Sequence, residues 1–199
     1  LAALDGDYTV LMQRFNTGLV VLALVALLVG RRVIPFFAMR AVQGLEIPLH
    51  VRSGQMQLGA CGVGALAMLA GLHPLTTVAL GVAGALALWQ VISWKPLAVR
   101  HNPLLWILYA GFTGLGLGLL VAALKAAGLE LHPALPVHTI AMAGFSVLII
   151  GMVTRTALGH LGRPLATDRS MRASYVLMLL AALLRLLALA PTPLTPLLL

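Results

Sequence analysis

The sequence predicts an all-α protein, a polytopic transmembrane helix bundle with about six spans. Of the 199 residues, 61% are hydrophobic and only 9% are charged, and the mean hydropathy is +1.03. These values lie far from the balance of a soluble domain. The apolar stretches are long and lack the strict polar and apolar alternation of barrel strands. Because only helices and closed barrels satisfy their backbone hydrogen bonds in hydrocarbon, the spans are predicted to be helices.

Six apolar stretches are each long enough to cross a bilayer core, which takes about 20 residues. Charged residues, prolines and glycines separate them. In chain order, the predicted spans are 12–30, 54–72, 75–94, 103–124, 136–155 and 172–190. The first is the weakest, because Gln13, Arg14 and Asn16 crowd its start. We therefore expect this span to begin at the membrane interface.

Residues 31–52, between the first two spans, are predicted to form a basic loop at the membrane interface. Four arginines and one glutamate surround Pro35, Phe36 and Phe37 in this stretch. Aromatic rings beside arginines are typical of segments that lie at the headgroup level.

The basic residues predict an orientation in the membrane. Ten of the 13 fall in or beside the first, third and fifth loops. They are Arg31, Arg32, Arg40, Arg52, Lys95, Arg100, Arg155, Arg163, Arg169 and Arg172. Short loops rich in Lys and Arg stay cytoplasmic, so both termini are predicted to face outward. The net charge of +8 is thus a topology and anionic-lipid signal, and nucleic acid is not an expected partner.

The six histidines are the residues most suited to cofactor chemistry, and the predicted topology divides them into two sets. His50, His101 and His160 fall on the inner side, while His73, His132 and His138 fall on the outer side. His138 and His160 lie 22 residues apart, about 33 Å along a continuous helix, so they cannot share one metal ion. Neutral imidazole binds haem iron, copper or zinc. The alternative is that each histidine is a partly solvated interfacial residue.

Two arginines lie within or at the end of predicted spans. Arg185 lies toward the outer end of the last span, where it either reaches the headgroups or pairs with an anion. Arg155 and His160 are about 140° apart on a regular helix, so they do not share a face. Gly159, Gly162 and Pro164 predict a structured turn over 156–164 that brings Arg155 and His160 toward one another or toward a common anion.

The fifth span carries a family resemblance. "VHTIAMAGFSVLIIGMVTRTALGHLGRPL", residues 137 to 165, resembles the hallmark segment of the NnrS family. Further similar stretches occur in the same order, namely "GRRVIPFF" at 30–37, "PLLWIL" at 103–108 and "ALLRLLA" at 182–188. The resemblance implies a multi-pass protein of the bacterial inner membrane that contains haem and copper and is linked to nitric oxide metabolism in denitrifying and pathogenic bacteria.

Family members have about twice as many spans, so residues 1–199 are expected to be a single transmembrane domain from the C-terminal half of a larger protein. Two other features agree with this expectation, since the chain begins at Leu1 and ends in the apolar "PTPLTPLLL". Membrane helices absent from this chain are then possible partners, alongside the lipid bilayer.

The resemblance also implies site residues. It selects His138, Arg155, His160 and Arg185 for cofactor binding, with His138 and His160 as metal ligands, together with Arg31, Pro35, Gly162 and Arg163. The sequence departs from the family at Tyr109, where a histidine is frequent. That departure implies a lost site, a phenolate replacement or a site that was never needed.

Two functions stay open from the sequence. The first is a haem- and copper-binding protein of nitric oxide metabolism or nitrosative-stress protection, in which an interior-facing Arg185 assists an outer-side ligand, His138, with Met142 nearby. The second is a transporter or assembly module whose histidines are interfacial. All five acidic residues lie in predicted loops or termini, which weakens a proton-coupled carrier. The sequence does not decide whether the protein is an enzyme.

Overall fold

The structure is a computed structural model that describes residues 8–48 and 50–189. The long helices in these ranges are α1 (Tyr8–Ala41), α2 (Val51–Leu69), α3 (His73–Ser93), α4 (Pro103–Ala126), α6 (Val147–His160) and α7 (Arg169–Ala188). Shorter elements are the 3-10 helix η1 (Pro96–Val99), the single turn α5 (Leu135–His138) and the π-helix η2 (Thr139–Ser146). Neither range contains a strand, so the all-α prediction is confirmed.

Five of the helical stretches are long and apolar enough to cross a membrane. They are α1, α3, α4, the continuous run from α5 through η2 to α6, and α7. The remaining long helix, α2, carries Arg52, Gln55 and Gln57 near its start, which lowers its hydropathy. It still packs along α1 and α3 and completes the group of helices expected from the sequence.

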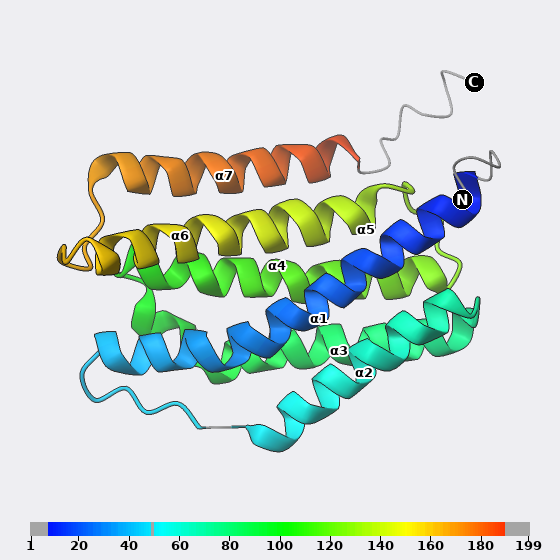
Figure 1. Ribbon diagram of the computed structural model, residues 1–199, viewed down its shortest axis with the longest axis horizontal. Helices are drawn as coiled ribbons and strands as arrows, with labels where there is room; N and C mark the ends of the chain where they lie inside the picture. The colour runs from blue at the N-terminus through cyan, green and yellow to red at the C-terminus, as the bar shows by residue number, and fades with distance from the viewer. Residues whose placement is uncertain (1–7, 49, 190–199) are drawn as a thin grey trace.

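The helices run back and forth in an up-and-down bundle (Figure 1). The first helix begins, and the last helix ends, at the same end of the bundle. The first, third and fifth loops therefore share the opposite end, as expected from their arginines and lysines.

Helix α4 is the centre of the bundle. It packs against α1, α3, η2 and α6, and its inward leucines, with Phe112, are fully buried. Close approach to both neighbours depends on small residues. A methyl group at Gly114 would overlap the carbonyl oxygen of Ala143 in η2, and one at Gly84 of α3 would lie 2.7 Å from the carbonyl oxygen of Gly116. Glycines that let backbones approach are a common basis of helix packing in membranes.

The first helix is longer than predicted. It does not end at residue 30 but continues through Pro35 to Ala41, so the predicted 31–52 loop begins only at Val42. Ile34 and Ala38 follow Leu27 on the same buried face, and this packing maintains the helix although Pro35 removes one backbone hydrogen bond. At 34 residues the helix is about 51 Å long, so it extends well beyond a bilayer core of about 30 Å.

The shared end of the odd-numbered loops leads to a labelling prediction. We expect cysteines introduced at Gln43 and Arg163 to react with a membrane-impermeant maleimide from one side only, and a cysteine at Glu130 from the other. The charge distribution predicts that Gln43 and Arg163 face the cytoplasm. Buried Cys61 provides a low background. Labelling of Gln43→Cys and Glu130→Cys from the same side would contradict the arrangement.

Candidate functional site

His138 and Arg185 meet at the end of the bundle where α7 finishes. An Nη2 nitrogen of Arg185 lies 3.1 Å from Nε2 of His138, although the residues are 47 positions apart. Guanidinium has donors and no acceptor, so Arg185 donates and Nε2 of His138 accepts. The imidazole in this contact is therefore neutral, with its proton on Nδ1. The sequence placed both residues at similar depth, and the structure adds the direct contact.

Arg185 does not face the interior of the bundle, which corrects one expectation. Its side chain is exposed, and it reaches His138 across the seam between α7 and the fifth span. The inward positions of α7 are occupied by Tyr175 and Ala182 instead. Arg185 also lies in the last turn of α7, where the helix dipole favours a cation.

His138 immediately precedes a π-helical segment that the sequence pattern did not reveal. Thr139–Ser146 forms η2, and the Ser146 hydroxyl donates to the carbonyl of Ala141, five residues earlier. Hydrophobic periodicity cannot detect this segment, because Thr139–Ser146 is apolar on most of its circumference. Short π segments occur frequently at functional sites, and here the segment sets the direction of His138 relative to α6.

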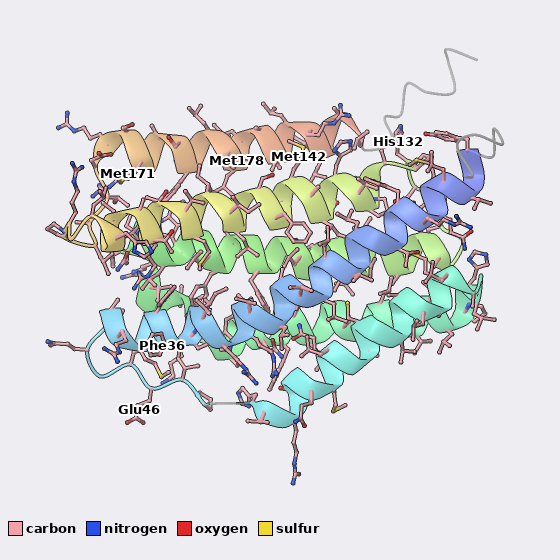
Figure 2. All side chains as sticks on the ribbon, in the orientation of Figure 1. Phe36, Glu46, His132, Met142, Met171 and Met178 are labelled. Atoms are coloured by element: carbon pink, nitrogen blue, oxygen red, sulfur yellow. The ribbon has the colours of Figure 1, made fainter. Side chains whose placement is uncertain are left out.

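Methionines line the seam between α7 and the fifth span. Met142 and Met178 lie along this seam in Figure 2, and both side chains are half-buried. Met142 belongs to η2, four residues after His138. Its thioether is a soft ligand for haem iron or Cu(I), and methionine also serves as an adaptable packing residue.

Arg155 and His160 do not come together, so the predicted turn over 156–164 is wrong. Helix α6 stays regular through His160, and the chain turns only after it, at Gly162, whose φ is +63°. The amide of Arg163 donates to the carbonyl of Leu158, and that of Gly162 to Gly159. This is the ordinary glycine-terminated helix end, which needs one residue of positive φ and leaves Gly159 helical.

Arg155 is a buried arginine with an aromatic partner. Its side chain is only 8% exposed, and its Cζ atom lies 4.0 Å from the ring centroid of Phe37 on α1. His160, in contrast, is exposed as the last residue of α6. The contact with Phe37 joins α1 to α6, which gives Arg155 a packing role that the sequence did not suggest.

Tyr109 occupies a structural position. Its hydroxyl donates to the carbonyl of Trp94 at 3.1 Å, and the two rings meet edge to face with centroids 5.9 Å apart. This hydrogen bond ties α4 to the end of α3. Tyr109 thus uses its hydroxyl within the protein.

The residue types at the contact between His138 and Arg185 fit a haem group. No group of three or more His, Cys, Asp or Glu side chains gathers within residues 8–48 and 50–189. At the other end of the bundle, the His50 ring packs against Trp89 at a tilt of 54°. His101 accepts from Arg100, and His160 stands at the end of α6. His138 would offer one imidazole to a haem iron, and the adjacent guanidinium of Arg185 would pair with a carboxylate of the haem.

One of three comparisons with known proteins found a match, and it agrees with the sequence motifs. A search of curated proteins found no match, and neither did a search of solved structures. The family model described as NnrS protein matches residues 1–199, which is the whole of this sequence. The chain therefore belongs to the NnrS family.

Proposed function

We propose that this protein binds haem at the outer end of the bundle and acts in nitric oxide metabolism or in protection against nitrosative stress. We further propose that it resides in a bacterial inner membrane. Family membership supports both statements. The observation that carries the site assignment is the contact between Arg185 and His138, which joins a neutral imidazole and a cation from two different helices.

In this proposal His138 would bind the haem iron, and Arg185 would pair with an anionic group of the haem. Nε2 of His138 carries the lone pair that a metal requires, and Arg185 now donates to it. For Nε2 to bind a metal, the guanidinium of Arg185 would have to leave it, and that guanidinium would then form a charge-assisted hydrogen bond with a haem propionate. Haem supplies, when bound, an iron centre able to bind diatomic molecules such as nitric oxide. The exposed side chain of Arg185 is free to make this small movement.

Copper is proposed from the family alone. The described side chains include no three-ligand group, and His160 offers one exposed imidazole at the opposite end of α6 from η2. His160 as a metal ligand remains a prediction.

Substitution of His138 tests the proposal. We expect His138→Ala in the full chain to lose its bound haem. Arg185→Leu should weaken haem retention by about tenfold, which is the lower end of the usual effect of removing a residue that supports a metal ligand. Haem is quantified from the optical spectrum of the purified protein before and after addition of nitric oxide. His73→Ala is the matched control, because His73 is an exposed histidine at the same end of the bundle.

Unchanged haem content and an unchanged nitric oxide response in His138→Ala would rule out His138 as the ligand. A wild-type protein that purifies without haem, and does not take it up when it is added, would favour the alternative function of a transporter or assembly module.

A further inference from the structure

A second polar site lies at the other end of the bundle. A cavity of about 350 Å³ opens between α1, α2 and α3. It is lined by two arginines, a histidine and polar or aromatic side chains, namely Arg31, Arg32, His50, Gln55, Gln90 and Trp94. Its volume is within the usual range of small-ligand sites, about 300–1,000 Å³. The site is distinct from the His138 region, which lies where α7 ends (Figure 1).

Two buried polar atoms at this cavity have no hydrogen-bond partner among residues 8–48 and 50–189. One is Nε of Arg31, a donor, and the other is Oε1 of Gln90, an acceptor. Gln90 is only 2% exposed. An unsatisfied buried polar group costs about 1–3 kcal/mol, so a bound molecule that pairs with both atoms would recover that cost. The required ligand has an acceptor for Arg31 and a donor for Gln90.

The charge around the cavity favours a ligand with an anionic group, such as a phosphate. Arg31 and Arg32 both line it, and none of its lining residues carries a carboxylate. Glu46, the acidic residue of the loop between α1 and α2, points away from the helices (Figure 2). Arg31 is also fitted closely against α2, because a methyl group at Gly54 would overlap its guanidinium. Because Gly54 has no side chain, the guanidinium of Arg31 has room to lie against α2.

The depth of the cavity matches the headgroup region. Residues 18–29 of α1 are uninterrupted by charge, and Arg31 and Arg32 follow directly. They thus lie where the apolar part of the helix ends, at the level of lipid phosphates. Basic pockets between helices at this depth are suited to the phosphate groups of lipid headgroups.

We propose that this cavity binds a phosphoester that also carries an ammonium or hydroxyl donor, as the headgroup of phosphatidylethanolamine does. The phosphate pairs with Arg31 and Arg32, and the N–H or O–H donor pairs with Gln90. The same chemistry occurs in free phosphoethanolamine, but the position at the headgroup level favours the lipid.

A comparison of two lipids tests this proposal without any mutation. Phosphatidylethanolamine and phosphatidylcholine have the same net charge and the same phosphate, but choline has no N–H donor. We expect native mass spectrometry of the detergent-solubilised full chain to show a retained phosphatidylethanolamine, and about tenfold weaker retention of phosphatidylcholine with the same acyl chains, the factor given by one hydrogen bond to a charged donor.

Variants assign the binding to the cavity. Arg31→Gln and Gln90→Leu should each weaken phosphatidylethanolamine retention by about tenfold or more. Arg40→Gln and Gln57→Leu are the controls, since Arg40 is an exposed arginine at the same end of α1 and Gln57 is a buried amide outside the cavity lining. Both controls should retain the lipid, and haem content should stay unchanged in Gln90→Leu and in both controls.

The contrary results are separate from those of the haem proposal. Equal retention of the two lipids, or retention unaffected by Arg31→Gln and Gln90→Leu, would overturn the headgroup site. Displacement of the lipid by millimolar phosphoethanolamine would identify the free phosphoester as a ligand of the same site. Loss of haem in Arg31→Gln with no change in lipid retention would overturn the headgroup site. The cavity would then be assigned to cofactor binding instead.

Discussion

Replacement of Gly114 by alanine is expected to destabilise the folded bundle by about 1–3 kcal/mol, the usual cost of inserting a methyl group into a packed interior. The added carbon would overlap the carbonyl of Ala143 and lie 2.7 Å from the amide nitrogen of Gly144. Both obstacles are backbone atoms, so no side-chain rotation can relieve the overlap. Helix α4 and η2 must separate, and the packing of the central helix is lost along its length.

Controls for Gly114→Ala are available elsewhere in the bundle. Gly18 in α1 and Gly59 in α2 have no neighbouring atom within 4 Å of the position that an added methyl group would take. Because alanine is favoured over glycine in a helix by roughly 0.5–1 kcal/mol, these substitutions should leave stability unchanged or raise it. Unfolding of the purified protein by SDS, followed by circular dichroism, measures the difference. Equal stability of Gly114→Ala and Gly59→Ala would contradict the close packing of α4 on η2.

Deletion of Ala141 from the π-helical segment is expected to separate His138 from Arg185. Without one residue, Thr139–Ser146 can return to α-helical hydrogen bonding. Everything on its N-terminal side then turns by about 100° relative to α6, the rotation of one residue in an α-helix. His138 would leave the seam with α7, and Ile140, now buried against α4, would move with it. Haem content should then fall as it does in His138→Ala.

A cross-linking measurement follows this rotation independently of haem. In a Cys61→Ala background, cysteines at His138 and Arg185 should be joined by a short bis-maleimide, and the Ala141 deletion should largely abolish the cross-link. Deletion of Leu131 is the control, because it shortens the preceding loop without changing the hydrogen bonding of the fifth span. Persistent cross-linking after removal of Ala141 would mean that the π segment does not orient His138.

Composition and hydropathy are enough to predict the membrane environment, the fold class and the order of the helices. Composition requires a membrane environment, and a backbone in hydrocarbon must satisfy its hydrogen bonds locally, so long apolar stretches become helices whatever they pack against. Two helix starts also follow from local hydrogen bonding, because a polar side chain caps each of them. Asn102 accepts from the amide of Leu104 at the start of α4, and Asp168 accepts from Met171 at the start of α7. The grouping of Arg and Lys at one end of the bundle follows from the same alternation of spans and loops.

Candidate residues could be selected from the sequence, but their partners could not. His138 and Arg185 were chosen from their depth and from the family resemblance, and the structure adds the contact between them. The predicted union of Arg155 and His160 was wrong, because Gly162 alone ends the helix and the aromatic partner of Arg155 comes from α1, more than a hundred residues earlier.

Features that depend on neighbouring helices became visible only in the tertiary structure. Helix α1 continues past Pro35 because Ile34 and Ala38 are buried against other helices, which local propensity does not record. Hydropathy cannot predict the π segment, because an apolar run has no preferred face. It also cannot predict that Oε1 of Gln90 is buried without a partner among the described residues, because a single glutamine in a sequence does not indicate its orientation. Local hydrogen bonding fixes which residues become helix, whereas packing between distant segments fixes where each helix ends, how it is wound and which polar atoms meet.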